Sequence, residues 1–485
     1  MHLYNVRLKQ LIIVIVCCWH FTAVVHAADS GTSETLAQSP TLLQSLMAKS
    51  GPTEQLSIIH KMVGDVSASR LEADIRTLVG FGTRHTLSET ESDIRGIGAA
   101  RRWIKAEFER ISDECNRCLE VFYVSRVIEG TRRIPEPVDV VSVVAIQRGS
   151  LDPDRFVLMS GDIDSRVTDP LDGTSDSPGA NDNATGMAGV IESARVLSKH
   201  KFAGSIIYAG LSGEEQGLFG GEIVVDHALA NNWRIKAVLN NDMIGNITGI
   251  DGVIDNTSAR VFSEGTRAVE TPEEAKIRRY SGGEVDSPSR NLARFIDRQA
   301  DKYIPNLDVM MVYRLDRFGR GGHHRPFNEA GIPGVRIMET HEHYDRQHQN
   351  LRTVENRNYG DVIEGVNFDY VRKLTALNVA SLAEMAYAPP FPAQVEIKGA
   401  VKASTTISWT KPADKTALNI AGYRVYWRLT DRPQWTYSRF VGDVESYEFK
   451  NIVIDNYYFG VSSVAKNGAE SPVVFPGPMG SFGGY

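Results

Sequence analysis

Short apolar runs alternate with amphipathic stretches along the chain up to about residue 388. Four of the runs are rich in β-branched and other apolar residues and have the length of buried strands, at residues 155–160, 205–210, 236–241 and 334–338. Between and around them, apolar residues recur at spacings of three and four, which is typical of helices, over residues 60–81, 92–111 and 186–200. Strands that alternate with helices predict an α/β fold, with a mixed, mostly parallel sheet flanked by helices.

The pattern changes beyond a proline-rich joint at residues 388–392. The runs that follow are short, alternating and rich in aromatic residues, with turn residues between them. Such a pattern over residues 393–480 predicts an all-β sandwich. Trp409 on an early run and the alternating Tyr423, Val425 and Trp427 on a central run resemble a fibronectin type III domain. The resemblance implies a spacer or adhesion module without catalytic residues.

The first residues have the layout of a secretory signal peptide. Arg7 and Lys9 precede an apolar stretch over residues 11–25, and the small residues Ala27 and Ala28 follow it. We expect a signal peptide over residues 1–27, a flexible lead over 28–54 and the α/β domain over 55–388. The alternative is an uncleaved membrane anchor, which the alanine-rich exit disfavours. The sequence therefore predicts a secreted or periplasmic protein with no membrane association after cleavage.

Export bears on Cys115 and Cys118, the two cysteines outside the leader. An oxidising compartment favours a disulfide between them. Thioredoxin-like redox chemistry would place such a pair where a strand meets a helix, but this pair follows a helical stretch and precedes a strand. A zinc knuckle would need two further Cys or His ligands nearby. A local structural disulfide is the preferred interpretation.

Composition excludes little. The 485 residues are 42% hydrophobic and 23% charged, with a formal net charge of −7. These values are ordinary for a soluble globular protein. Because the chain has no basic footprint, we do not expect a nucleic acid partner. The oligomeric state stays open.

Carboxylates and a histidine follow the predicted strands where the strands end. They are Asp162, Asp164, Asp182, Glu214, Glu215, Asp242 and His348. Ligands gather at the carboxyl ends of the strands in an open α/β sheet. Two metal ions about 3.5 to 4 Å apart need a bridging carboxylate and terminal ligands, and Asp182, in a turn before a helix, suits the bridge. One of the two adjacent glutamates can face the metals and leave its neighbour as general base.

The segments SGDIDS, PGANDNATG, SGEEQG and NNDMIGN, with the late histidine, resemble the family M28 zinc exopeptidases over residues 139–386. The resemblance implies a role for each residue. Asp182 matches the bridging ligand and Glu214 the general base, while Asp164 matches the residue that orients the ligand at position 162. The metal ligands that remain are Glu215 and His348 for one zinc, and Asp162 and Asp242 for the other.

The chain departs from the family pattern at three places. Asp162 stands where the family has His, and a carboxylate is shorter than an imidazole and adds negative charge. The Asp162–Asp242 position is therefore expected to bind zinc weakly or to prefer a harder divalent ion. His323 occupies a position that is acidic in many relatives, and His324 after it is expected to contact the substrate or a developing oxyanion. Asn181 replaces an Asp that is not a ligand.

The resemblance implies a secreted, metal-dependent exopeptidase that binds two divalent ions, expected to be zinc, and acts on a peptide or protein. Aminopeptidase action is favoured by the resemblance alone, since the same fold also hosts carboxypeptidases and glutaminyl cyclases. The alternative class is a catalytically silent protein whose metal-stabilised domain and sandwich serve recognition. Retention of both Glu214 and Glu215 argues against it, because a silent site needs no base beside a ligand.

Overall fold

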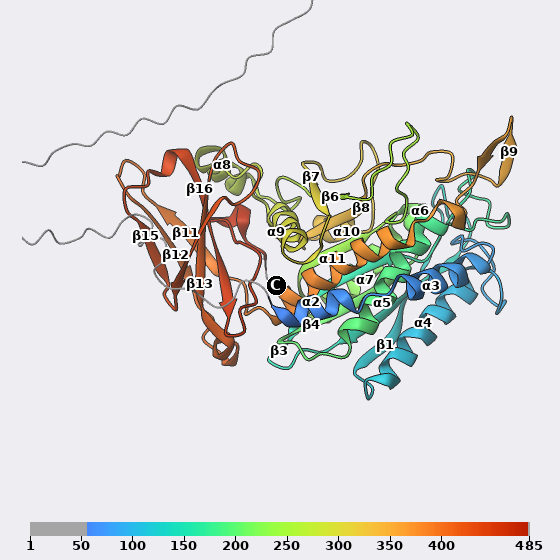
Figure 1. Ribbon diagram of the computed structural model, residues 1–485, viewed down its shortest axis with the longest axis horizontal. Helices are drawn as coiled ribbons and strands as arrows, with labels where there is room; N and C mark the ends of the chain where they lie inside the picture. The colour runs from blue at the N-terminus through green and yellow to red at the C-terminus, as the bar shows by residue number, and fades with distance from the viewer. Residues whose placement is uncertain (1–55, 484–485) are drawn as a thin grey trace, which may run out of the picture. The chain divides into compact units, whose positions relative to one another are not determined.

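A computed structural model describes residues 56–483 of the chain (Figure 1). The signal peptide and lead predicted for residues 1–54 lie outside the described residues. Residues 56–483 all belong to one compact unit. Among residues 56–483, no helix has the length and apolar character that a membrane span needs.

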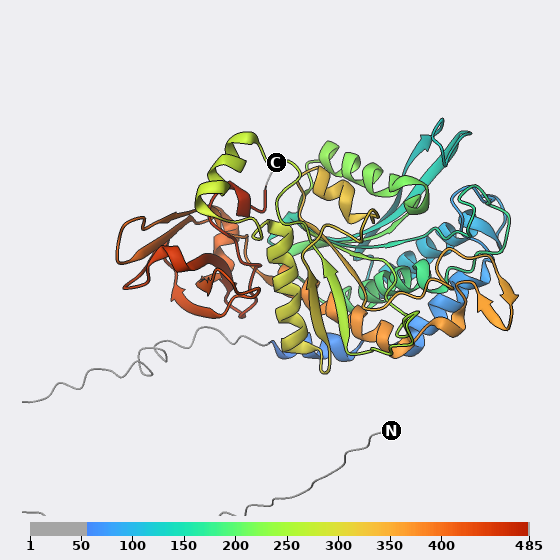
Figure 2. The same ribbon diagram turned by 90° about the horizontal axis from the view of Figure 1, so that it is seen from above.

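An eight-stranded sheet forms the centre of the α/β region, in the order β1-β2-β4-β3-β5-β8-β6-β7 (Figure 2). The strands are β1 (Leu119–Ile128), β2 (Val138–Gln147), β3 (Asp152–Asp162), β4 (Gly204–Leu211), β5 (Arg234–Asn241), β6 (Ser258–Phe262), β7 (Asp308–Val312) and β8 (Gly334–Glu339). The central pairs β4/β3, β3/β5 and β5/β8 are parallel, as is β6/β7, while β1/β2, β2/β4 and β6/β8 are antiparallel. The predicted mixed, mostly parallel sheet is confirmed.

Helices cover both faces of this sheet. Neighbouring side chains of a strand point to opposite faces, so one strand contributes apolar residues to two cores. In β4, Ile206 and Tyr208 belong to the apolar core that includes α5 and α11, and Ile207 and Leu211 to the core that includes α7 and α10. The helices are α2 (Ser57–Gly64), α3 (Ala68–Gly80), α4 (Gly96–Glu114), α5 (Gly186–Leu197), α6 (Glu214–Gly217), α7 (Phe219–Ala230), α8 (Pro272–Ser281), α9 (Pro288–Tyr303), α10 (His324–Glu329) and α11 (Phe368–Tyr387).

The helical stretch expected over residues 60–81 is two helices rather than one. α2 ends at Gly64 and α3 begins at Ala68. Ser67 lies between them in an extended conformation, and its hydroxyl accepts a hydrogen bond from the backbone N–H of Arg70 at 3.2 Å. A serine that caps a helix in this way favours a new helix start over a continuous helix. The predicted disulfide is also present, and joins Cys115 to Cys118 in the turn between α4 and β1.

The chain beyond residue 392 folds into two three-stranded antiparallel sheets, as the alternating pattern predicts. One contains β11 (Ala393–Lys398), β12 (Thr405–Thr410) and β15 (Ser446–Phe449), and the other β13 (Ile420–Leu429), β14 (Tyr437–Gly442) and β16 (Tyr457–Ala465). An aromatic core that includes Trp409, Tyr423 and Phe459 belongs to this region. The all-β architecture is confirmed, and the finer assignment to fibronectin type III stays a prediction.

A buried ion triplet joins the all-β region to the α/β region. Asp286, just before α9, accepts hydrogen bonds at 2.8 Å from Arg294 and, with both oxygens, from Arg428 of β13. The three side chains are at most 1% exposed. One carboxylate thus compensates two guanidinium groups that burial would otherwise make very costly.

We predict that Asp286→Ala lowers the free energy of unfolding by about 3 to 5 kcal/mol, because it leaves two buried guanidinium groups without their counter-charge. The matched control is Glu72→Ala, which removes an exposed pair with Arg76 and should cost less than about 1 kcal/mol. Urea unfolding followed by circular dichroism measures both. Equal losses for the two variants would contradict the role assigned to the triplet.

Candidate active site

The residues expected to form the site lie at one edge of the sheet. Asp162 ends β3, Glu214 and Glu215 follow β4, and Asp242 follows β5. Because β4, β3 and β5 are parallel neighbours, their carboxyl ends meet at the same edge. Asp182 lies in a short π-helical turn, Ala180–Thr185, that leads into α5, and His348 lies in the loop after β8.

Two glycines let the turn that carries Asp182 approach the strand ends. A Cβ on Gly161 would lie 2.6 Å from the carbonyl carbon of Gly186, and a Cβ on Gly186 would lie 2.3 Å from the carbonyl oxygen of Asn241. Both distances are far shorter than van der Waals contact. A side chain at either position would push the turn away from β3 and β5, and Asp182 with it.

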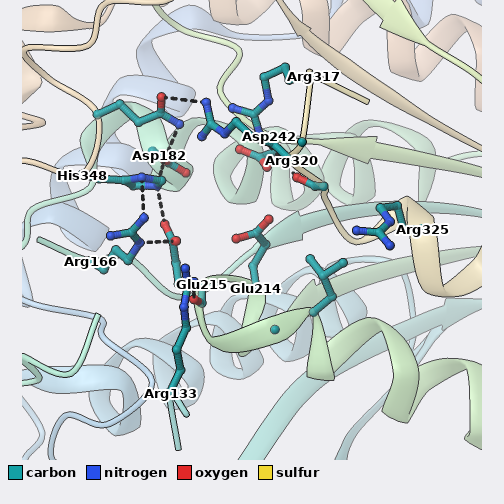
Figure 3. Close-up of a pocket in the computed structure, with 15 residues that line it drawn as sticks. Arg133, Arg166, Asp182, Glu214, Glu215, Asp242, Arg317, Arg320, Arg325 and His348 are labelled. Atoms are coloured by element: carbon teal, nitrogen blue, oxygen red, sulfur yellow. Dashed lines mark hydrogen bonds and ion pairs between the residues drawn. The ribbon is translucent and has the colours of Figure 1, made fainter. Parts of the chain in front are cut away.

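Asp182, Glu215 and His348 form a compact set of three potential metal ligands (Figure 3). His348 Nε2 lies 3.0 Å from Asp182 Oδ2 and 2.9 Å from Glu215 Oε1. One ligand atom of each residue lies within 4.8 Å of the other two. Two carboxylates and one imidazole are a donor set that zinc accepts, with a fourth position left for water or substrate. The residues therefore fit a metal ion at this position, which we call the first metal position.

A proton takes part in holding this set together. Burial disfavours a charged imidazole, but the carboxylates of Glu215 and Asp182 outweigh burial and raise the pKa of His348. On the other side of the set, Arg166 donates to Glu215 Oε2 at 2.6 Å, and its Nη2 lies 2.7 Å from His348 Nδ1. A guanidinium can only donate, so in the neutral imidazole this contact makes Nδ1 the acceptor and places the hydrogen on Nε2, between the two carboxylates. A cation at the first metal position would take the place of that hydrogen.

The second expected metal position, Asp162 with Asp182 and Asp242, is different. Both oxygens of Asp162 are engaged, one by His323 Nδ1 at 2.6 Å and the other by the side-chain amide of Asn183 at 2.7 Å. Asp242 Oδ2 pairs with the buried Arg336 at 2.8 Å. Of the carboxylate oxygens of Asp162, Asp182 and Asp242, Asp242 Oδ1 is the one that is buried without a hydrogen-bond partner. The residues at this position therefore fit a second ion less well than those at the first.

Two of the departures from the family pattern meet in the Asp162–His323 contact. These residues are 161 positions apart in the chain and both are buried. Burial raises the pKa of Asp162 to about 8, although the amide of Asn183 works in the opposite direction, and burial lowers the pKa of His323 to about 4. The contact thus joins the carboxylate of Asp162, at the end of β3, to the imidazole of His323, just before α10.

Asp164 has a different partner from the one expected. Its carboxylate accepts the backbone N–H groups of Glu214 at 3.2 Å and Glu215 at 3.1 Å, and the hydroxyl of Thr86 at 2.9 Å. It thus fixes the turn that presents both glutamates rather than the side chain of Asp162. Burial and the neighbouring carboxylates of Glu215 and Asp242 raise the pKa of Glu214 well above its ordinary value. Such a carboxyl group favours its neutral form until a nearby cation compensates its charge.

His324 does not reach the cavity next to these residues. Its side chain is fully buried at the start of α10, where Nε2 faces the carbonyl oxygen of Leu315 at 2.9 Å. The loop that enters α10 turns the imidazole toward the backbone of residue 315 rather than toward Glu214. His324 is therefore not in a position to contact a substrate in this cavity.

The cavity beside the glutamates has a volume of about 330 Å³ and an unexpected number of arginines. Sequence reasoning missed them, although Arg166 directly follows IDS after β3. It also missed Arg336, which pairs with Asp242 and is the one charged residue of the run at 334–338. The lining includes Arg133, Arg166, Arg317, Arg320 and Arg325 beside Asp182, Glu214, Glu215, Asp242 and His348.

The sequence analysis also missed a buried carboxylate next to the turn that carries Asp182. Asp361 is buried and accepts the backbone N–H groups of Asn181 at 2.9 Å and of Asp182 at 2.7 Å. Asn181 in turn donates its side-chain amide to both oxygens of Glu339, at 3.1 and 2.9 Å. Asn181 thus helps to hold the turn in place.

An α/β sheet with a carboxylate–imidazole metal site and an adjacent glutamate at its strand ends defines the class of this protein. Residues 142–367 match the model of peptidase family M28. The chain is 42% identical over 433 residues to a protein of Leptosphaeria maculans described as a probable zinc metalloprotease, with 89% of this chain and 99% of the relative covered. A relative of the same description from Pyricularia oryzae is 40% identical over 87% of this chain and 84% of its own length. The chain belongs to peptidase family M28.

Solved structures also align with the chain. One is the LapA aminopeptidase of Legionella pneumophila, at 19% identity and a TM-score of 0.49, with 73% of this chain and 82% of that chain covered.

We predict that Asp361→Ala lowers the affinity for zinc about tenfold to a hundredfold, because the backbone that carries Asp182 loses its buried acceptor. Competition with a chromogenic chelator measures the affinity. The control is Glu364→Ala, an exposed carboxylate three residues further along the same loop. Unchanged zinc binding by the folded Asp361 variant would show that the turn does not need this support.

Proposed function

We propose that the protein is a secreted zinc-dependent exopeptidase that hydrolyses N-terminal peptide bonds. The observation that carries the proposal is the position of Glu214 in one cavity with the three ligand atoms of Asp182, Glu215 and His348. Membership of family M28 and relatives described as zinc metalloproteases support the metal and the reaction class. The choice of the amino end rests on the family resemblance of the motifs, and secretion on the signal-like N-terminus.

Zinc bound at the first metal position would supply Lewis acidity toward the scissile carbonyl. The residues of the chain do the rest. Glu214, with its raised pKa, accepts a proton from the attacking water and returns it to the leaving amine. Asp164 and Asp361 keep Glu214 and Asp182 in place through their backbone N–H groups.

We further propose that the two metal positions are unequal. Asp182, Glu215 and His348 hold the ion that the reaction requires, whereas Asp162 and Asp242 bind zinc weakly or take a harder divalent ion. The contacts of Asp162 with His323 and of Asp242 with Arg336 support this, since a second ion would have to compete with both. The sandwich, in this proposal, is a spacer of the fibronectin type III kind.

Hydrolysis of a panel of aminoacyl chromogenic substrates by the purified protein tests the proposed function. Activity that disappears with a chelator and returns with zinc supports it. A metal-loaded, folded protein that cleaves no member of the panel would contradict it, and would favour the catalytically silent class.

We predict that Glu214→Gln lowers kcat about a hundredfold or more, the ordinary worth of general-base catalysis, while zinc content stays unchanged. Initial rates and elemental analysis of the same samples measure the two quantities. Glu222→Gln, an exposed substitution of the same type on α7, serves as the control. Near-native turnover of the fully loaded Glu214 variant would falsify the assigned role.

We predict that the double variant Asp162→His/His323→Asp binds a second zinc ion more tightly than the wild type. The exchange offers an imidazole to the second metal position and a carboxylate behind it, an arrangement that orients metal-binding imidazoles. Asp162→His alone should gain less, because it faces the unchanged imidazole of His323. Zinc titration of the metal-free proteins decides; two equally tight sites in the wild type would contradict the proposed inequality.

A further inference from the structure

The cavity beside Glu214 is lined by equal numbers of arginine side chains and of acidic or histidine side chains. Five guanidinium groups surround Asp182, Glu214, Glu215, Asp242 and His348 (Figure 3). These five guanidinium groups carry out no step of the hydrolysis proposed for Glu214. The contacts of each arginine decide whether it only compensates a carboxylate or has capacity left for a ligand.

Three of the five arginines are committed to carboxylates of the chain. Arg166 pairs with Glu215 at 2.6 Å. Arg317 and Arg320 both pair with Glu342, at 3.2 and 3.1 Å. These three groups neutralise charges of the site and of the loop behind it.

Arg133 is different. It lies in the loop between β1 and β2, and its guanidinium donates to the backbone carbonyl oxygen of Glu215. Among residues 56–483, no carboxylate makes an ion pair with it. A second guanidinium, that of Arg166, lines the same cavity. Arg133 therefore has both unused donors and an electrostatic reason to bind an anion.

Arg325 lies at another side of the same cavity. Its acidic partner is Glu329, at 3.0 Å and more than half exposed, and such surface pairs are weak and screened by solvent. Its Nε is buried without a hydrogen-bond partner among the described residues. In Figure 3, the side chain of Arg133 approaches the base of Glu215, while Arg325 lies beyond Glu214. The two guanidinium groups thus approach the Glu214–Glu215 pair from different directions.

We propose that Arg133, assisted by Arg325, binds a carboxylate of the substrate, so that the enzyme prefers substrates with a negative charge on the residue next to the scissile bond. This inference rests on the proposed exopeptidase function and names its substrate class. Arginine suits the task because its planar fork can donate two parallel hydrogen bonds to one carboxylate. A cavity of about 330 Å³ confines the substrate to the neighbourhood of both groups.

The carboxylate could come from two parts of a peptide. One source is the side chain of an N-terminal Asp or Glu, which fits the proposed aminopeptidase action. The other is the free C-terminal carboxylate, which a carboxypeptidase would recognise. Both present the same group to the arginines, and matched substrates separate them.

The first arm compares glutamyl and glutaminyl chromogenic substrates, which have nearly the same shape and differ in charge. The wild type should have the higher kcat/KM for the glutamyl substrate. Arg133→Gln should reduce kcat/KM for that substrate about tenfold to a hundredfold, the worth of a hydrogen bond to a charged group, with a smaller effect on the glutaminyl substrate. Arg133→Lys should recover part of the preference, because it keeps the charge but loses the fork.

Arg132→Gln is the matched control, since Arg132 is its exposed neighbour and does not line the cavity. Circular dichroism and zinc content verify that each variant is folded and loaded. An equal loss on both substrates, or no preference in the wild type, excludes recognition of an acidic N-terminal side chain, and it overturns the inference unless the second arm assigns the arginines to a C-terminal carboxylate. Cleavage of neutral substrates would in that case still leave the exopeptidase function standing.

The second arm uses N-acylated dipeptides that end in a free carboxylate or in an amide. Cleavage of the free acid alone, lost in Arg133→Gln, assigns the arginines to the C-terminal carboxylate and supports the inference in that form. Cleavage of neither, with the glutamyl preference intact, assigns them to an acidic side chain. Failure of every substrate in both arms contradicts the proposed function itself.

Discussion

The crowding of buried carboxylates at the ends of β3, β4 and β5 is the constraint on which the rest of the site depends. Burial raises the pKa of Asp162 and of Asp242 to about 8 and that of Asp164 to about 7, so these groups favour their neutral forms unless cations or donors compensate them. A chain that retains such a cluster must supply positive charge within a few ångströms, because unpaired buried charge is very costly. The protein supplies it from arginine and histidine side chains, with room for a metal ion.

The compensation is divided unevenly between the two halves of the cluster. Around Glu215 and Asp182 it comes from His348 and Arg166, in a geometry that a cation can take over. Around Asp242 it comes from the buried Arg336, which also pairs with Asp316 and donates to the carbonyl oxygen of Gly321, while Asp162 is in contact with the buried imidazole of His323. A side chain anchored in this way is harder to displace than a proton. The difference between the halves is the physical basis of the proposed inequality of the two metal positions.

Charged side chains also line the cavity beside the site and the junction between the α/β region and the sandwich. Arg133 lines the cavity and makes no ion pair with a carboxylate among the described residues. At the junction with the sandwich, Arg294 and Arg428 instead share the buried carboxylate of Asp286. A buried shared carboxylate holds a junction together, whereas an arginine without a carboxylate partner can bind a ligand.

The sequence determined the α/β class, the sandwich and which carboxylates follow the strands, because these are local patterns. A run such as residues 205–210 predicts a buried strand, and a glutamate pair directly after it must lie at the strand end. The outer strands β6 and β7 are short, and their places depend on pairing with each other and with β8. The contact of Asp162 with His323 and the approach of Arg133 to Glu215 join residues 161 and 82 positions apart. Only the tertiary structure decided those contacts, since side-chain neighbours across such separations are set by how the strands order in the sheet and not by any local spacing.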